Sequence, residues 1–181
     1  MNDTPIFSLL RPMRLFLALP VPSDSLILLQ RKFVADGIRL VHDFHCTVQF
    51  FGEIEHPSET VRRLQTLHFG RFSAHFSRLG VFPSEHSVRI IWVDLQPQRT
   101  ILSLHKKIEC AFDVSSHDTR FFPHVTLARV SFLKNTQQLL NTLSALPVPS
   151  HSFDVSELLL LRSTLTPHGP LYSIVERFPL S

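Results

Sequence analysis

Phe44-His45-Cys46-Thr47-Val48 and Pro123-His124-Val125-Thr126-Leu127 are two versions of one pattern, a His-x-Thr triplet inside an apolar run. Short apolar runs of this kind favour buried β-strands. Side chains at positions i and i+2 of a strand point to the same face, so each triplet projects an imidazole and a hydroxyl side by side. Cys46 and Val125 then face the other way. Because a helical pattern follows each triplet, the chain hints at two related halves that bring their histidines to one site.

The other elements follow from hydrophobic spacing, helix caps and turn residues. Helices are expected over about 24–35, 57–67, 98–112 and 135–146. Besides the two triplet strands, strands are expected over 13–19, 38–41, 72–82, 88–95, 152–165 and 171–178, with a turn at 83–87. The mixed order predicts an α+β fold with antiparallel sheets. No segment is rich enough in Gly, Ser or Pro to mark a linker, so we expect a single domain.

Composition narrows the function classes without selecting one. The chain of 181 residues is 44% hydrophobic and 18% charged, which is typical of a globular protein. Its net charge of +3 permits an anionic substrate but is small for a dedicated nucleic-acid binder. Cys46 and Cys110 lack the spacing of a metal or redox motif, which indicates reduced thiols. With no long apolar run and no signal-peptide core, we expect a cytoplasmic protein without a membrane partner.

The triplets carry the residue types that break a phosphodiester without a metal or cofactor. Histidine's usual pKa, about 6.5, lets one ring be neutral while the other is protonated near neutrality. Such a pair can take a proton from an incoming hydroxyl and give one to a departing oxygen. The hydroxyls of Thr47 and Thr126 can donate to the phosphoryl oxygens. Arg129 can add a bidentate contact, but strict alternation turns it away from His124 unless the strand ends, bends or bulges.

Other chemistries find less support. The nine histidines outside the triplets lack the same context, and we expect most of them at the surface or in turns, with His42 and His168 nearest the site. There is no His-Glu-x-x-His pattern and no glycine-rich phosphate loop. Cys46 points away from His45, which disfavours a cysteine nucleophile. A zinc site of His45, His124 and a third histidine stays open, although it leaves the paired threonines unexplained.

The sequence resembles the two-histidine phosphoesterase superfamily and, within it, the bacterial and archaeal RNA 2′,3′-cyclic phosphodiesterases, historically called 2′-5′ RNA ligases. The matching segments are 13–20, 45–53, 80–83, 91–93, 123–130, 161–163 and 178–180, together with Tyr172. The chain departs from the family at Cys46 and Phe51, where an aliphatic residue and a leucine are usual. Since relatives begin near Met13, residues 1–12 are expected to be an N-terminal extension of a single catalytic domain, 13–181.

The resemblance implies a bilobal α+β fold whose two antiparallel sheets are related by a pseudo-twofold around a central groove, with the helices outside. It implies His45 as proton donor and His124 as proton acceptor, with Thr47, Thr126 and Arg129 on the phosphate. The implied reaction is metal-independent hydrolysis of an RNA terminal 2′,3′-cyclic phosphate to a 2′-phosphomonoester, reversible to 2′-5′ ligation.

Two alternatives to this reaction remain. The first is a phosphodiesterase that acts on small cyclic nucleotides or ADP-ribose cyclic phosphate. The second is a module that binds RNA cyclic-phosphate ends without turnover. In each case we expect a monomer without a cofactor, whose partner is an RNA end or a small cyclic nucleotide.

Overall fold

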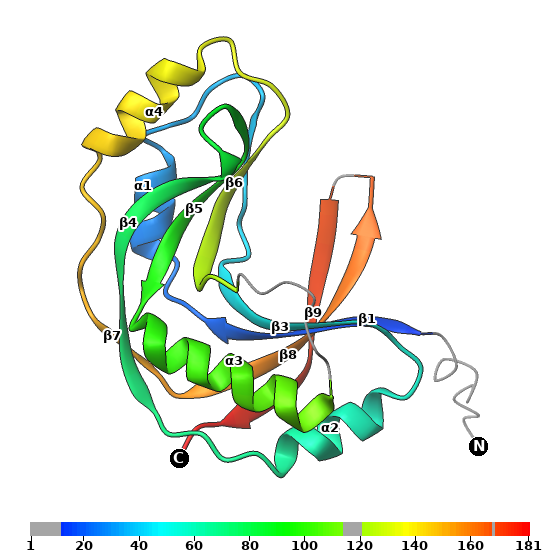
Figure 1. Ribbon diagram of the computed structural model, residues 1–181. Helices are drawn as coiled ribbons and strands as arrows, with labels where there is room; N and C mark the ends of the chain where they lie inside the picture. The colour runs from blue at the N-terminus through cyan, green and yellow to red at the C-terminus, as the bar shows by residue number, and fades with distance from the viewer. Residues whose placement is uncertain (1–11, 114–120, 168) are drawn as a thin grey trace, which may run out of the picture.

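The computed structural model describes residues 12–113, 121–167 and 169–181, in which four helices and nine strands follow the mixed order expected (Figure 1). The helices are α1 (Asp24–Gln30), α2 (Pro57–Gln65), α3 (Gln98–Phe112) and α4 (Thr136–Ala145). The strands are β1 (Met13–Pro20), β2 (Ile38–Leu40), β3 (His45–Ile54), β4 (Phe72–Ser84), β5 (Ser87–Gln96), β6 (His124–Val130), β7 (Phe153–Val155), β8 (Glu157–Thr166) and β9 (Gly169–Pro179). Except for Pro12, the expected extension lies outside the described residues, and so does His168.

All strand pairs are antiparallel, and together they form one curled sheet in the order β7-β4-β5-β6-β3-β1-β8-β9, with β2 added to β6. The order is symmetric about the junction of β6 and β3, the two strands that begin with the His-x-Thr triplets. These two strands pair at Cys46 and Val125. The α+β antiparallel fold is thus confirmed, and the two sheets expected from the sequence are the halves of one continuous sheet.

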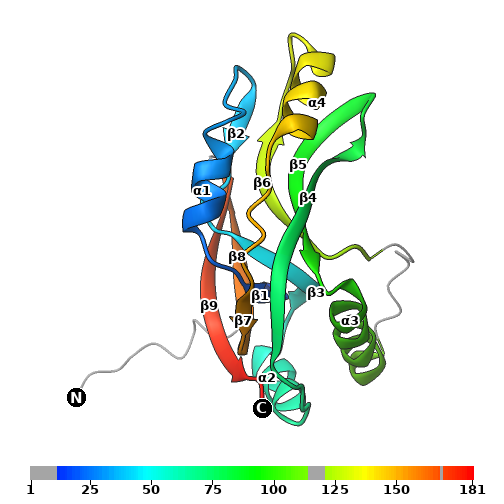
Figure 2. The ribbon, with the colours of Figure 1, turned by 90° about the vertical axis from the view of Figure 1, so that its left-hand side faces the viewer.

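The helices lie on the outer side of the curl, as Figures 1 and 2 show. Helices α1 and α4 pack against β6 and β4, whereas α2 and α3 pack against β9 and β3. Helix α3 also contacts β5, so it reaches across the centre of the sheet into the other half. The concave face is left open for a site at the centre.

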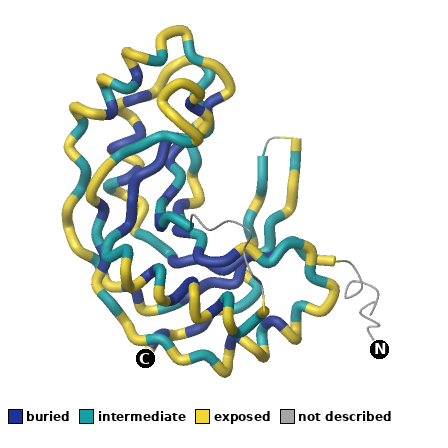
Figure 3. Tube along the Cα trace, viewed as in Figure 1, coloured by how far each residue is buried: buried dark blue, intermediate teal, exposed yellow. Residues whose placement is uncertain are grey.

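Strand β1 is buried on both faces, which explains its continuous apolar sequence (Figure 3). Leu15, Leu17 and Leu19 enter the main core between sheet and helices, and each is 0% exposed. Phe16 and Ala18 point the other way, into a smaller cluster on the concave side. This smaller cluster also contains Leu159, Leu161 and Tyr172.

Two expected elements end differently in the structure. Helix α1 stops at Gln30 rather than near residue 35, because the N–H groups of Lys32 and Phe33 donate to carbonyls only three residues earlier. This tight turn places Phe33 in the core, where it is 4% exposed. The strand expected over 152–165 is divided at Ser156, since β7 pairs with β4 while β8 pairs with β1 and β9.

Candidate active site

The centre of the sheet brings the two triplets together. Cys46 of β3 lies directly opposite Val125 of β6, and both side chains are 0% exposed. One step along antiparallel strands in either direction places each histidine opposite the threonine of the other triplet. By strand alternation all four side chains lie on the face opposite the two buried central residues. The two imidazoles and two hydroxyls therefore form a two-by-two array on the concave face.

Each imidazole is oriented by the backbone just before it. The Nδ1 atom of His45 lies 2.9 Å from the carbonyl oxygen of Asp43, and that of His124 lies 2.8 Å from the carbonyl oxygen of Phe122. A carbonyl only accepts hydrogen bonds, so Nδ1 carries a proton in both rings. Nε2 is then the atom that can gain or lose a proton, and no described residue bonds to it in either ring. The same tautomer in both rings equips either histidine to be acid or base.

Burial lowers the pKa of both histidines below the usual 6.5. The two rings differ in what opposes this decrease. At His45 the carbonyl and the carboxylate of Asp43 raise the pKa, while the positive charges of His124 and Arg129 lower it further. At His124 only the carbonyl of Phe122 raises the pKa. The carboxylate thus favours the protonated form at His45, the ring for which the resemblance implies the donor role.

Aromatic rings bury the two imidazoles. The ring centroid of His45 lies 5.1 Å from that of Phe16 and 5.0 Å from that of Tyr172. His124 meets the ring of Phe82 edge-on at 5.0 Å. Such contacts restrict ring rotation and exclude water from one side. None of these three rings was expected beside the histidines, because an aromatic residue in a strand looks the same in the sequence whether it lines a site or fills a core.

A β-bulge brings Arg129 to the groove. Two consecutive residues of β5 pair with Thr126 and Ala128, so Leu127 is an extra residue in β6. Leu127 and Ala128 are both buried, and Arg129 returns to the face of Thr126. The bulge is the departure from strict alternation that Arg129 needs in order to face the groove. Arg129 lines the same groove as His45 and lowers the pKa of that ring.

The other triplet strand contains the same irregularity. Two consecutive residues of β1 pair with Thr47 and Gln49, so Val48 is the extra residue of β3. Val48 and Gln49 are both buried, and Phe50 returns to the concave face, where it is 45% exposed. Phe50 therefore holds the place in β3 that Arg129 holds in β6.

A buried polar side chain holds each bulge from the helix side. The amide Nε2 of Gln30 donates to the carbonyl of Leu127 at 2.6 Å, and Nδ1 of His105 donates to the carbonyl of Val48 at 2.7 Å. The two side chains are 1% and 6% exposed. His105 is an exception to the expectation that most histidines outside the triplets lie at the surface or in turns, since it packs under the sheet. A polar residue within the apolar stripe of each predicted helix was the available signal for both.

The concave face holds two adjoining hollows. One of about 410 Å³ runs from His45 and Thr47 to Arg14 and Phe50. The other, of about 380 Å³, shares His45 and Thr47 and continues to Thr126 and His42, as expected for His42. Both hollows include Arg129 and Arg39, and Arg39 lies opposite Arg129 across β2 and β6. Arg39 was missed, because nothing in its sequence context distinguishes it from a surface arginine.

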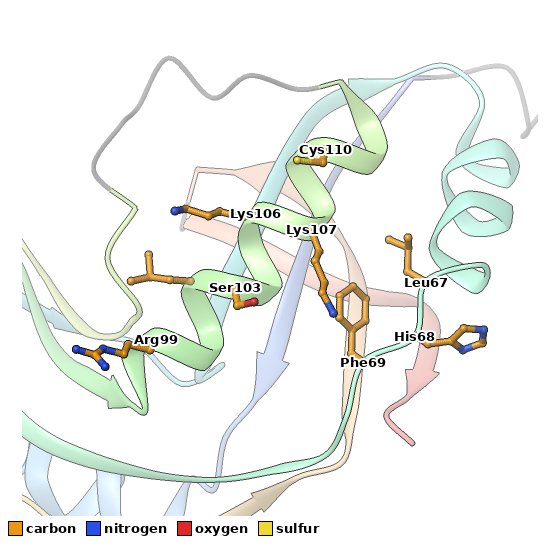
Figure 4. A pocket seen from close by; sticks show the side chains of 9 residues that line it. Leu67, His68, Phe69, Arg99, Ser103, Lys106, Lys107 and Cys110 are labelled. Atoms are coloured by element: carbon orange, nitrogen blue, oxygen red, sulfur yellow. The ribbon is translucent and has the colours of Figure 1, made fainter.

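A larger hollow, of about 660 Å³, lies elsewhere. It is formed by α3 and the segment after α2, and Figure 4 shows Arg99, Lys106 and Lys107 projecting around it. None of the triplet residues lines it. It gathers cations around a single histidine, His68, and lacks paired imidazoles, so we place the reaction in the concave groove.

Two chemical alternatives lose support in this geometry. Burial raises the pKa of Cys46 to about 12, so this thiol is protonated at neutral pH and is a poor nucleophile. Across residues 12–113, 121–167 and 169–181, no three His, Cys, Asp or Glu side chains are gathered to hold a metal ion. The three-histidine zinc site therefore finds no third ligand in the described part of the chain.

An antiparallel sheet curled around a groove, with a His-x-Thr triplet on each central strand, defines the two-histidine phosphoesterase class. Residues 16–166 match the model of the 2′-5′ RNA ligase superfamily, and the chain belongs to this superfamily. An RNA 2′,3′-cyclic phosphodiesterase of Methanocaldococcus jannaschii is 27% identical over 176 residues, which cover 92% of this chain and 100% of that protein. One of Aeropyrum pernix is 34% identical over 137 residues, covering 72% of this chain and 78% of the relative.

Solved structures agree with this assignment. A protein of Thermus thermophilus is similar with a TM-score of 0.73 and 29% identity, over 93% of this chain and 98% of that protein. The apo form of E. coli LigT has a TM-score of 0.75 and 23% identity, over 94% and 99% of the two chains, and shares the fold.

Proposed function

We propose that the protein hydrolyses the 2′,3′-cyclic phosphate at the end of an RNA and leaves a 2′-phosphomonoester. The observation that carries the proposal is the pair of imidazoles on one concave face, each with Nδ1 tied to a carbonyl and Nε2 available. The name RNA 2′,3′-cyclic phosphodiesterase, shared by relatives that match most of the chain, supports this substrate.

The reaction needs one proton taken and one proton given. Nε2 of neutral His124 accepts a proton from water as the water oxygen bonds to phosphorus. The bond from phosphorus to the 3′ oxygen breaks, and Nε2 of protonated His45 donates its proton to that oxygen. The products are a 2′-phosphomonoester and a 3′-hydroxyl. With the 5′-hydroxyl of a second RNA in place of water, the same step joins the two ends through a 2′-5′ bond. Cleavage of that bond, which re-forms the cyclic phosphate, is the reverse reaction.

The phosphate charge is met by three donors on the same face. The hydroxyls of Thr47 and Thr126 have no hydrogen-bond partner among the described residues, so both are available to phosphoryl oxygens. Likewise, no carboxylate in the described ranges forms a salt bridge with Arg129. Its planar guanidinium can hold two phosphoryl oxygens at once. Donors that are already in place cost little reorganisation when charge develops in the transition state.

We also propose that the protein is a cytoplasmic monomer, with RNA ends as its partner. Cys46 is a buried free thiol and Cys110 an exposed one. An exposed unpaired thiol fits a reducing compartment. Among the described residues, no helix is both long and apolar enough to cross a membrane.

The proposed function is tested by identifying the product that the protein forms from a short RNA ending in a 2′,3′-cyclic phosphate. Phosphorus NMR is expected to show a 2′-phosphomonoester, and a 3′-specific phosphatase is expected to leave it intact. A 3′-phosphate product would reverse the roles of His45 and His124. An RNA that is bound but unchanged would identify a binding module, and consumption of small cyclic nucleotides or ADP-ribose cyclic phosphate alone would identify the other enzyme class.

The pH dependence is expected to report the asymmetry between the two rings. Because kcat/KM needs His45 protonated and His124 neutral, and both pKa values lie below 6.5, activity should peak below pH 6.5. It should then fall by about tenfold per pH unit on the alkaline side. Asp43→Asn removes the carboxylate that raises the pKa of His45, so the alkaline limb should move to lower pH. Asp154→Asn, at an exposed site on β7, is the control, and a limb unmoved by Asp43→Asn would contradict the donor assignment.

Metal removal is expected to leave turnover unchanged. The phosphate charge can be met by protein donors alone, so extended dialysis against EDTA should not lower kcat. The measurement is kcat before and after chelation, with zinc and manganese added back. Loss on chelation that zinc or manganese restores would favour a metal-assisted reaction instead.

A further inference from the structure

The groove continues well beyond the two histidines and two threonines of the triplets. From His45 and Thr47 it runs along β3 and β1 to Arg14 and Phe50 in a single hollow of about 410 Å³. At about 3.3 Å per residue, the step from Thr47 to Phe50 spans roughly 10 Å. Three arginines and no acidic residue line this hollow among the described parts of the chain. Its charge therefore suits a second anionic group next to the cyclic phosphate.

The outer end of the groove presents a cation on an aromatic ring. The guanidinium carbon of Arg14 lies 4.8 Å from the ring centroid of Phe50. Arg14 is half-buried, and Phe50 remains 45% exposed although it is a large apolar side chain. The strand register places Arg14 opposite Glu53, yet no carboxylate of the described residues forms a salt bridge with this arginine. The fork of its N–H donors is thus available to a ligand.

We propose that Arg14 and Phe50 form a second nucleotide subsite, which selects an RNA chain over a single cyclic nucleotide. Arg14 binds the phosphate that joins the last two nucleotides, and the Phe50–Arg14 pair provides a stacking surface for the penultimate base. Guanidinium planes and aromatic rings both stack with bases, while the guanidinium edge stays free to bind phosphate. The subsite rests on the proposed function, because its place is defined relative to the reacting phosphate.

The symmetry of the two triplet strands supports this assignment. The bulges bring Phe50 and Arg129 to equivalent positions, three residues after the two threonines. One strand thus offers a cation to the reacting phosphate, and the other offers an aromatic surface. The site is symmetric in its acid–base groups and asymmetric in these two side chains. An RNA substrate is asymmetric in the same way, because its chain continues from only one side of the terminal nucleotide that carries the cyclic phosphate.

Kinetics with two substrates test the subsite. The substrates are a short RNA ending in a 2′,3′-cyclic phosphate and 2′,3′-cyclic AMP, which lacks the second phosphate and base. Phe50→Ala is expected to lower kcat/KM for the RNA by roughly 5- to 150-fold, whereas Phe50→Tyr should retain most of it. Arg14→Gln should lower it by roughly 10- to 150-fold. For cyclic AMP both variants should stay within about twofold of wild type, since the subsite would be empty.

Salt dependence separates the two side chains. A lost phosphate contact lowers the slope of log affinity against log salt by about 0.7 for a single strand. Arg14→Gln should show this decrease and Phe50→Ala should not. The matched controls are Arg62→Gln, at an exposed arginine of α2, and Phe132→Ala, at a phenylalanine that is 53% exposed. Neither control substitution should change kcat/KM for the RNA substrate or its salt dependence.

Three results would overturn the subsite. The first is an equal decrease in kcat/KM for both substrates in the Arg14 and Phe50 variants. The second is no decrease for RNA in these variants, and the third is an equally large decrease in the control variants. If the wild-type protein consumes neither substrate, the proposed function fails. The subsite is then tested by RNA-binding measurements instead of kinetics. Fluorescence anisotropy with a labelled RNA ending in a 2′-phosphate then compares the same variants. Weaker binding by Arg14→Gln and Phe50→Ala alone would support the subsite, and unchanged binding would refute it.

Discussion

Replacing His45 with alanine, and separately His124 with alanine, is expected to lower kcat on RNA cyclic phosphate by about 10²–10⁴-fold each. Each ring handles a different proton, one from water and one to the leaving oxygen. Both Nδ1 atoms are held by backbone carbonyls, so neither ring is free to turn and take over the other's role. The double variant should be little worse than either single one, since the two rings act as a unit. The measurement is single-turnover kinetics with matched circular dichroism spectra.

The pH profile of each variant identifies which proton was lost. His45→Ala should lose the alkaline limb, because the donor is gone, and His124→Ala should lose the acidic limb. His151→Ala, which should leave the profile unchanged, is the control, since His151 is exposed and lines neither hollow of the concave face. Turnover near the wild-type value in either triplet variant, with an unchanged fold, would refute the two-histidine mechanism.

Most elements were predictable because local signals decided them. The apolar runs and turn residues located the strands, with β7 and β8 expected as one, and each helix begins within a residue or two of its expected start. The end of α1 was not predictable, since it depends on a tight turn that brings Phe33 into the core. The break at Ser156 depends on which strands its two neighbours pair with. These are tertiary effects that local propensity does not contain.

The predicted site residues lie together, but the structural features that bring them together could not be predicted from the sequence. His-x-Thr periodicity places a histidine and a threonine on one face in each strand, and that much follows from the sequence. The bulge at Leu127 leaves no mark in the sequence, because an extra residue in a strand shows only against its partner. Without this bulge Arg129 would point away from the groove. The buried donors Gln30 and His105 were missed for a related reason, since only the folded chain shows which carbonyls need them.

Replacing Arg129 with glutamine is expected to lower kcat/KM by about 10²–10³-fold, the usual cost of removing one donor from a charge-stabilising site. The guanidinium faces the groove from the residue after the bulge and has no salt-bridge partner among the described residues. It is therefore available to hold the charge that develops on the phosphoryl oxygens. Arg129→Lys should recover only part of the activity, because an ammonium keeps the charge but not the planar fork.

A second readout separates contact with phosphate from a structural role. The positive charge of Arg129 lowers the pKa of His45, so Arg129→Gln should raise that pKa. The alkaline limb of kcat/KM should then move to higher pH, opposite to the shift expected for Asp43→Asn. Arg62→Gln, with its charge on the outer helix α2, should leave both rate and limb unchanged. A loss of less than tenfold, or a large loss without a shift of the limb, would mean that Arg129 does not act at the phosphate beside His45.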